Sequence, residues 1–445
     1  MRVYVRLSFL ESLSSLESGE ESNKWRTHLG LVQKSVNKET LVESLSRVLV
    51  EYYPLAGRLR KCLEKEDNGK LEIECNGEGA VFAEAKMDLS AEEFLEFFAA
   101  KPNRSLRKFM YKVEAPAFLD IPPLVIQVTN LRCGGMMLCT AISHCLCDGI
   151  GTSQFLHAWA HACRSSDSNP TTNLPSLPFH DRQVLKPRSP PHVTFPHPEF
   201  TNTAPNDSNP QTGPNIFKYL QSQPLVPASI TFSPSQILHL KSQCGPSLKC
   251  TTFEVLASHT WRCWVKSLGL PLSMPVKLLF SVSIRTKMSP SIPQGYYGNA
   301  FVMGCAEAEA KELVTPNMRD GVKLVRHAKS TITNDYVHSM IDLLEDKTLR
   351  TDLSTTLVIS QWAKLGLEDL DFGEGKPIHM GPLTSDIYCL FLPVVGDFEA
   401  VKVLVSMPES VVDKFELYMT EFCGVVENGD AKNHYEVDNL KMVSV

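Results

Sequence analysis

The sequence predicts an α/β protein of two lobes, and three observations support that prediction. Its 445 residues are too many for one ordinary hydrophobic core. Strand-like and helix-like patterns occur in both halves of the chain. Between Pro170 and Pro227 the composition changes, because thirteen of the 29 prolines lie there among Ser, Asn and Thr, which is typical of a linker. We therefore expect an N-terminal lobe, a long crossover linker and a C-terminal lobe over residues 1–168, 169–228 and 229–445.

The N-terminal lobe should contain one well-defined helix near its start. From Asn37 to Tyr52 the apolar residues recur on one helical face, and Pro54 ends the pattern. A second helical stripe follows Gly149 and includes Trp159. Short apolar runs predict strands, and the last of them leads directly into a histidine. These strands are expected at Leu71–Cys75, Val81–Glu84, Leu124–Thr129 and Met136–Ile142.

The C-terminal lobe has clear helix-start signals. Ser233–Gln236 and Thr251–Glu254 each place Ser or Thr three residues before Gln or Glu, which is the capping-box pattern. Pro234 at the first helical position strengthens the first signal. Two strands and a final amphipathic helix should complete the lobe. The strands are expected at Val276–Ser283 and Val401–Met407, and the helix carries Val412, Phe415, Met419 and Phe422.

Composition excludes several classes of function. The formal charge is −6 and no basic run stands out, so a nucleic-acid partner is not expected. The longest apolar stretches are strand-sized, and none is long enough to span a membrane. The 13 cysteines are odd in number and follow no framework spacing, which favours reduced thiols in the cytosol. We expect a cytoplasmic monomer.

The segment His144–Gly149 is the strongest candidate for chemistry. A buried strand ends at the histidine, so its imidazole, which titrates near neutrality, is placed to take a proton from an alcohol or an amine. Asp148 could orient the ring or hold the loop by pairing with a cation. The alternative without a catalytic role is a buried histidine followed by an aspartate in a turn. Cys145 and Cys147 raise the alternative of a metal, but Cys-x-Cys is not a usual zinc pair and no second pair lies at zinc-like spacing. We expect no metal.

Other segments turn this modest signal into a family resemblance. His144–Gly149 (HCLCDG) resembles the His-x-x-x-Asp-Gly motif of the plant BAHD acyl-CoA-dependent acyltransferases. Asp371–Pro377 (DFGEGKP) resembles their Asp-Phe-Gly-Trp-Gly-Lys-Pro block. The order and spacing of the motifs agree from about Leu7 to Phe422. Three further segments resemble family blocks, namely Tyr53–Leu59, Ser283–Arg285 and Gly295–Asn299.

The resemblance implies a fold and a reaction. The fold would be two chloramphenicol-acetyltransferase-like lobes with mixed sheets flanked by helices, joined by the crossover linker. The reaction would be O-acyl transfer in plant specialised metabolism, with acyl-CoA as co-substrate and no other cofactor. In the family the acyl-CoA donor and a small-molecule alcohol or amine acceptor enter a channel from opposite faces. His144 would deprotonate the acceptor, which attacks the thioester in a ternary complex without a covalent acyl-enzyme.

The resemblance also implies supporting roles for other residues. Asp148 would point away from the channel and pair with Arg285, which makes it structural rather than part of a proton relay. Asp371, Gly373 and Gly375 would lie away from the channel and support the geometry of the lobes. Glycines suit such a tight loop because other residues would be strained there.

The chain departs from the family pattern at three places. Glu374 replaces the usual tryptophan, and we expect position 374 to lie between the lobes with its carboxylate exposed or paired. In the segment Ser360-Gln361-Trp362, Gln361 takes the place of a hydroxyl that would stabilise the oxyanion. Trp362 is then the channel residue, or else an ordinary core tryptophan. Leu7–Glu11 (LSFLE) is a degenerate form of Leu-Ser-x-Leu-Asp with a short segment before it.

These departures leave one alternative function open. A non-catalytic relative could keep the fold and act through protein partners. It would tolerate loss of His144. The intact set of His144, Asp148 and Arg285 favours the enzyme.

Overall fold

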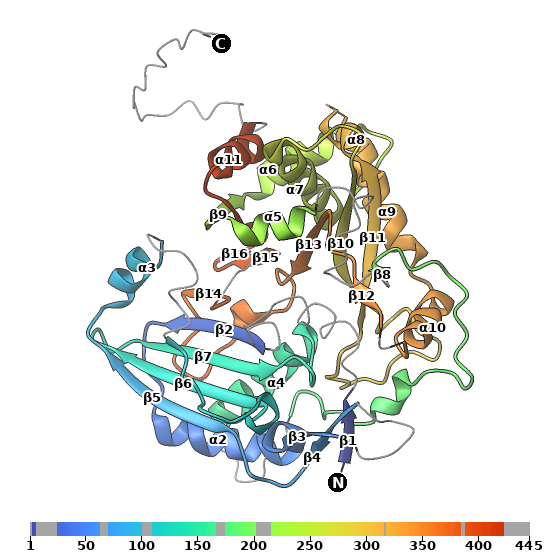
Figure 1. The fold of residues 1–445 in the computed structure, drawn as a ribbon. Helices are drawn as coiled ribbons and strands as arrows, with labels where there is room; N and C mark the ends of the chain where they lie inside the picture. The colour runs from blue at the N-terminus through green and yellow to red at the C-terminus, as the bar shows by residue number, and fades with distance from the viewer. Residues whose placement is uncertain are drawn as a thin grey trace.

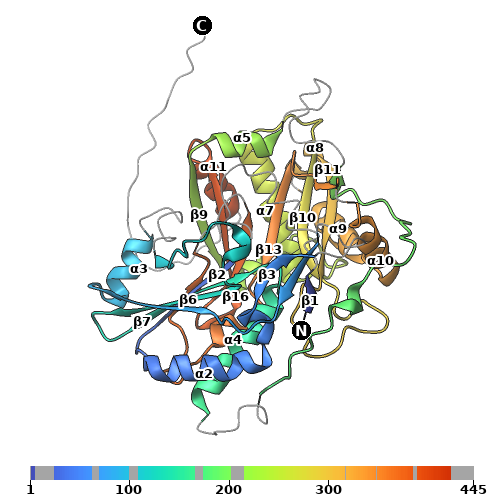
Figure 2. The ribbon, with the colours of Figure 1, turned by 60° about the horizontal axis from the view of Figure 1, so that its bottom comes forward.

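The computed structural model describes most of the chain and shows two lobes, one above the other in Figure 1. Each lobe is built on a mixed β-sheet with helices packed against it. The strands of the two large sheets run in different directions, as Figure 2 shows. The described residues are 2–5, 25–62, 70–99, 109–165, 174–201, 215–315, 317–346, 348–383 and 388–421.

The N-terminal lobe contains a five-stranded sheet in the order β14-β2-β7-β6-β5. Only β5 and β6 are parallel to each other. α2 and α4 cover one face and α3 covers the other. The strands are β2 (Trp25–Val32), β5 (Val81–Met87), β6 (Leu124–Leu131), β7 (Met136–Ser143) and β14 (His379–Gly381), and the helices are α2 (Lys38–Glu51), α3 (Ala91–Ala99) and α4 (Gly149–Arg164).

Strand β7 carries the chain to the candidate histidine. All eight of its residues are buried, because helices cover both faces of the sheet there. A strand covered on both faces reads as a continuous apolar run rather than an alternating one. The predicted strand at Met136–Ile142 is therefore confirmed, with one residue added at its end.

The C-terminal lobe contains a six-stranded sheet in the order β11-β10-β13-β15-β16-β9. One face packs against helices in a large core that includes Trp261 and Trp264. Both predicted capping boxes are present, at Ser233 and Thr251. The strands are β9 (Leu225–Phe232), β10 (Pro275–Ser283), β11 (Phe301–Glu309), β13 (Thr356–Gln361), β15 (Cys389–Val394) and β16 (Asp397–Pro408). The helices are α5 (Ile216–Ser222), α6 (Pro234–Ser242), α7 (Thr252–Leu268), α8 (Ala310–Val314), α9 (Met318–Thr331), α10 (Asn334–Leu343) and α11 (Val412–Thr420).

Two small sheets complete the described structure. The first is three-stranded, in the order β1-β4-β3, and the second pairs β12 with β8. Their strands are β1 (Arg2–Val5), β3 (Arg58–Lys61), β4 (Leu71–Glu74), β8 (Phe200–Thr201) and β12 (Arg350–Thr351). Phe422 and the Leu7–Glu11 motif lie outside the described residues.

Regular structure begins earlier in the predicted linker than the sequence indicated. Helix α5 and the first residues of β9 both precede residue 229. Prolines are frequent in the linker as a whole, and they conceal the short apolar face of α5. Ile216, Phe217 and Leu220 are buried there, so α5 packs onto the C-terminal lobe.

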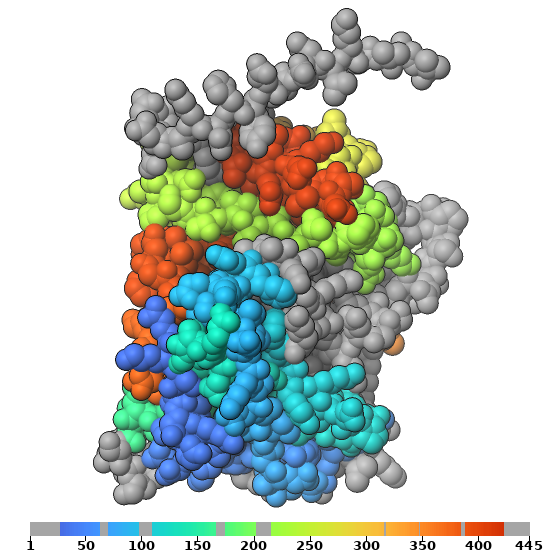
Figure 3. Space-filling model, turned by 90° about the vertical axis from the view of Figure 1, so that its left-hand side faces the viewer, coloured from blue at the N-terminus to red at the C-terminus, as the bar shows by residue number. Residues whose placement is uncertain are grey.

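The two lobes also share one sheet. Strand β14 comes from the C-terminal half, yet it pairs with β2 of the N-terminal lobe, Met380 opposite Gly30. In Figure 3 orange residues of the C-terminal half run down beside the blue N-terminal residues. A strand of three residues is too short to show a pattern in the sequence. The expected C-terminal lobe over 229–445 therefore also contributes to the N-terminal sheet.

Helix lengths can be compared with the thickness of a bilayer. Among the described residues, no helix combines the length and apolar character that crossing a membrane requires.

Candidate active site

His144 lies where the two lobes meet. It follows the last residue of β7, and only 7% of it is exposed. Its backbone carbonyl accepts a hydrogen bond of 2.8 Å from Asn299 Nδ2, from the segment that leads into β11 of the other lobe. Its ring centroid is 6.3 Å from that of Phe301, the first residue of β11. Both lobes therefore fix the position of the histidine.

Asp148 is the N-cap of α4, and four hydrogen bonds hold its carboxylate. Oδ1 accepts from the backbone N–H of Gly151 at 2.8 Å and from Arg285 Nη2 at 2.9 Å. Oδ2 accepts from Arg285 Nη1 at 2.7 Å and from the backbone N–H of Ala300 at 3.0 Å. A carboxylate has about four lone-pair sites, so these bonds use its accepting capacity. Of the two uses left open for Asp148, the geometry favours holding the loop over orienting the imidazole.

Arg285 joins this loop to the Gly295–Asn299 segment. Besides its two-pronged contact with Asp148, its Nη2 donates to the carbonyl of Gly298 at 3.0 Å. The short loop after β10 therefore brings Arg285 to the N-terminus of α4. Three motifs therefore meet around His144, and two of them come from far along the chain: Arg285 is 137 residues from Asp148, and Asn299 is 155 residues from His144.

Residues of the crossover linker pack against the Gly295–Asn299 segment. The sequence did not reveal this contact. The guanidinium of Arg182 lies over the rings of Tyr297 and Tyr296, with its carbon 4.3 Å and 5.1 Å from their centroids. His180 Nδ1 is 3.1 Å from the Tyr297 hydroxyl. Burial, together with the Arg182 cation, lowers the pKa of His180 to about 4, so its ring is neutral at pH 7. The one signal available was an aromatic and basic run, Phe179–Arg182, inside a proline-rich stretch.

One glycine is required for the close approach of α4 to the same segment. A Cβ at Gly151 would overlap the backbone carbonyl of Tyr297. Any larger residue would push α4 away from Tyr297 and disturb Asp148, which caps that helix.

Strand alternation decides which side chains of Ser360-Gln361-Trp362 share a face. Leu357 and Ile359 belong to the core beneath the helices, whereas Val358 belongs to a cluster on the opposite face. Because successive side chains point to opposite faces, Ser360 lies on the face of Val358 and Gln361 does not. Gln361 therefore points away from the face that carries Trp362, whereas Ser360 shares that face.

Trp362 lies on the face of the sheet that is opposite the helices. It clusters there with Leu390 and Leu404 and is 6% exposed. Its ring centroid is 4.9 Å from that of His28, on β2 of the N-terminal lobe. Trp362 is thus buried between the lobes. This position fits both interpretations of the residue, a channel residue and an ordinary core tryptophan.

The Asp371–Pro377 block lies at the other end of α4 from His144. Arg164, at the end of this helix, donates to the Asp371 carbonyl. Asp371 Oδ1 accepts from the backbone N–H of Gly373 at 2.7 Å and of Gly375 at 3.1 Å. The 16 residues of α4 span about 24 Å. The block is therefore held together by its own aspartate and lies away from the histidine.

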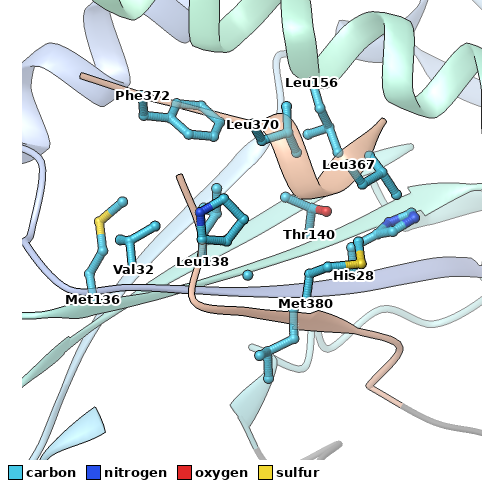
Figure 4. Close-up of a pocket in the computed structure, with 13 residues that line it drawn as sticks. His28, Val32, Met136, Leu138, Thr140, Leu156, Leu367, Leu370, Phe372 and Met380 are labelled. Atoms are coloured by element: carbon cyan, nitrogen blue, oxygen red, sulfur yellow. The ribbon is translucent and has the colours of Figure 1, made fainter. Parts of the chain in front are cut away.

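A small cavity of about 40 Å³ lies under this block. Figure 4 shows Phe372 and Leu156 on one side of it and Met136, Leu138 and Thr140 of β7 on the other. Its lining is mostly apolar. Its volume would hold a water molecule, and the Thr140 hydroxyl is buried without a hydrogen-bond partner among the described residues.

Glu374 is exposed to solvent, which is one of the two outcomes expected for it. Replacing it by tryptophan should change the free energy of unfolding by no more than about 0.5 kcal/mol, because no packed surface surrounds it. The matched control is Gly373→Ala, where φ is 116° and strain should cost about 1–3 kcal/mol. Denaturant unfolding of both variants checks this, and a large change for Glu374→Trp would show hidden packing at that position.

Cys145 and Cys147 raised the question of a metal. Among the residues that the structure describes, no group of three or more His, Cys, Asp or Glu side chains is placed to hold an ion.

The chain matches a family model and two plant proteins over most of its length. Residues 27–421 match the family model described as the Transferase family. The chain is 36% identical over 387 residues to omega-hydroxypalmitate O-feruloyl transferase of Arabidopsis thaliana, covering 85% of this chain and 81% of that protein. It is 35% identical over 382 residues to fatty alcohol:caffeoyl-CoA acyltransferase of the same plant, covering 85% of each.

Solved structures confirm the predicted fold. Vinorine synthase superposes with a TM-score of 0.66 at 19% identity, covering 94% of this chain and 93% of that one. TRI101 of F. graminearum, complexed with coenzyme A and deoxynivalenol, superposes with a TM-score of 0.73 at 19% identity, covering 93% and 96%.

The comparisons give no support to the non-catalytic alternative, since the two plant relatives above are named as transferases. The family model covers nearly all of the chain that carries the motifs. The identity of the relatives extends over most of both chains. The chain belongs to the Transferase family, the BAHD acyl-CoA-dependent acyltransferases.

Proposed function

We propose that His144 is the general base for acyl transfer from an acyl-CoA thioester to a hydroxyl group. The observation that carries the proposal is its position, since a buried strand of one lobe and Asn299 before β11 of the other hold it at their junction. In the reaction the imidazole takes the hydroxyl proton, and the oxygen attacks the thioester carbonyl. The tetrahedral oxyanion collapses, the C–S bond breaks, and the imidazolium returns the proton to the CoA thiolate.

Asp148 and Arg285 serve this step by holding the loop. Their two-pronged contact is almost fully enclosed, with side-chain exposures of 5% and 18%. A bidentate arginine–carboxylate contact fixes orientation as well as distance. The pair therefore keeps His144 and the N-terminus of α4 in a constant relation to Gly298.

The hydroxyl of Ser360 is the better candidate for an oxyanion donor. It lies on the sheet face of Trp362, which turns toward the N-terminal lobe. Ser360→Ala is expected to lower kcat by about 10²–10³-fold, the usual loss for one oxyanion donor. Gln361→Ala is the matched control and should leave kcat nearly unchanged, because its side chain points to the other face. A near-wild-type kcat for Ser360→Ala would remove its hydroxyl from the mechanism.

The acceptor is proposed to be an alcohol and the donor a hydroxycinnamoyl-CoA. Two relatives are named for O-feruloyl transfer to omega-hydroxypalmitate and for caffeoyl-CoA transfer to fatty alcohols. An amine acceptor is the second candidate, because an oat relative at 30% identity is named as an N-hydroxycinnamoyltransferase. The named complex of TRI101 with coenzyme A supports a CoA co-substrate.

A thiol-release assay tests the proposal. The purified protein is incubated with acetyl-, benzoyl-, coumaroyl-, feruloyl- or caffeoyl-CoA and a library of alcohols and amines, and free CoA thiol is measured. Release that depends on an alcohol supports the proposal. Release only with amines would favour the second candidate. We also propose that the enzyme is a cytoplasmic monomer, which gel filtration and localisation of a tagged chain would check.

A further inference from the structure

The crossover linker runs beside the Gly295–Asn299 segment. The backbone N–H of Phe179 donates to the carbonyl of Gly295 at 2.9 Å, and the two stretches of chain are parallel there. One residue further along, His180 Nδ1 lies 3.1 Å from the Tyr297 hydroxyl. His180 and Tyr297 are 117 residues apart in sequence, so this contact joins the linker to a distant part of the chain.

Arg182 is the charged member of the contact. Its guanidinium lies over the rings of Tyr297 and Tyr296, and a Cβ at Gly298 would overlap its Nη1 atom. Both terminal nitrogens are buried, and no carboxylate bonds to either of them within the described ranges of the chain. A buried cation without a counter-charge is costly, and the ring faces offset part of that cost. The stability of the fold alone therefore does not favour arginine over an apolar side chain of similar length at position 182.

The segment under Arg182 leads directly to His144. Asn299 follows Gly298, and its Nδ2 donates to the backbone carbonyl of His144 at 2.8 Å and to that of Cys145 at 3.3 Å. A displacement of the segment would therefore move Asn299 and the two carbonyls that it holds.

The backbone and the rings of the segment are held by different groups. On the backbone side, Arg285 donates to the carbonyl of Gly298 at 3.0 Å. On the aromatic side, Arg182 covers the ring of Tyr297, and the ring centroid of Tyr52, from the N-terminal lobe, is 5.1 Å from that of Tyr297. Loss of the Arg182 guanidinium would leave the backbone bond in place and loosen the rings, which shifts the segment without unfolding it.

We propose that Arg182 is a positioning residue for His144 and acts through Tyr296, Tyr297 and Asn299. The inference rests on the proposed function, because it takes His144 as the general base. A general base must lie about 2.6–3.2 Å from the atom whose proton it takes, and a misplacement of about 1 Å can lower a rate by about 10²-fold. Arg182 acts through the segment and not on the substrate, so its loss should lower kcat and leave KM unchanged.

The first test replaces the cation. Arg182→Met keeps a side chain of similar length and removes the charge. We expect kcat to fall by about 10- to 100-fold, with KM for donor and acceptor within about twofold of wild type. Arg182→Lys places a cation over the same rings and should recover part of the lost kcat. Thiol release, measured on protein that circular dichroism shows to be folded, gives these values.

Arg188→Met is the matched control in the same linker. Arg188 pairs with the buried Asp342 of α10, with 2.6 Å between Nε and Oδ2. Its variant should be less stable, because a buried carboxylate loses its cation, and it should keep wild-type kcat below its melting temperature. An equal loss of kcat in Arg182→Met and Arg188→Met would overturn the inference, since any weakening of the linker would then have the same effect.

Chemical modification of His144 gives a second readout that needs no catalysis. Diethyl pyrocarbonate acylates neutral imidazoles that it can reach, and mass spectrometry of the peptides gives the rate at each histidine. His144 is only 7% exposed, so loosening its anchor in Arg182→Met should raise its rate by about threefold or more. The exposed His239 should react at the same rate in both proteins.

The two readouts separate this inference from the proposed function. An unchanged kcat in Arg182→Met would overturn the inference, whatever the rate at His144. A lower kcat with an unchanged rate at His144 would also overturn it, because His144 would then be held without Arg182. Faster modification of His144 in Arg182→Met, in a protein whose wild type releases no CoA with any donor and acceptor, would sink the proposed function and leave the anchor standing.

Discussion

Replacement of His144 by alanine is expected to lower kcat by about 10²–10⁴-fold, the usual worth of a general base. The loss should appear in kcat at saturating donor and acceptor, because the imidazole acts on the acceptor proton and not on binding. Stopped thiol-release assays on folded protein measure it. The fold should survive, since the bond that ties this residue to Asn299 uses the backbone carbonyl of His144.

His239→Ala is the control for a general effect of losing a histidine. His239 is exposed on α6, in the other lobe. Its variant should keep wild-type kcat. A His144→Ala protein that turns over within a few-fold of wild type would contradict the mechanism, whatever its acceptor specificity.

Replacement of Asp148 by alanine should have the largest effect on stability. It leaves the largely enclosed guanidinium of Arg285 without its carboxylate and uncaps α4. Breaking a buried pair in this way costs about 3–5 kcal/mol. The melting temperature and kcat should fall together, because the loop that carries His144 loses its anchor. Thermal unfolding by circular dichroism and thiol release measure the two effects.

A double-mutant cycle isolates the pair. Asp148→Ala combined with Arg285→Ala should destabilise less than the sum of the single variants, since the second change removes a charge that the first left unpaired. The exposed pair of Asp320 and Lys323 on α9 is the control, with both side chains more than half exposed. Its cycle should show little coupling. Strict additivity at Asp148 and Arg285 would mean that the pair does not form in solution.

Local patterns explain why much of the fold could be predicted from the sequence. The capping boxes at Ser233 and Thr251 and the periodic helix after Asn37 are short-range signals, and the structure contains all three helices. The proline-rich segment hid α5, because its apolar face is only two turns long. No local pattern reports a three-residue strand such as β14.

The candidate site depended more on resemblance than on pattern. Arg285 lies 137 residues from Asp148, and nothing local links them. Two of the four bonds to Asp148 come from backbone N–H groups, of Gly151 and Ala300, which no residue type encodes. Whether Ser360 or Gln361 shares the sheet face of Trp362 depends on which residue begins the alternation of side chains along β13. The position of Arg182 depends on the path of the crossover through space.

Strand β14 has a consequence for how the chain is made. As the protein leaves the ribosome from its N-terminus, β2 is present long before residues 379–381, which will pair with it. During that interval β2 is an open sheet edge, and unpaired edges are templates for wrong pairing. The N-terminal lobe can therefore complete its sheet only when most of the C-terminal lobe has been synthesised. The two lobes are completed together, and β2 of a nascent chain stays an open edge until they are.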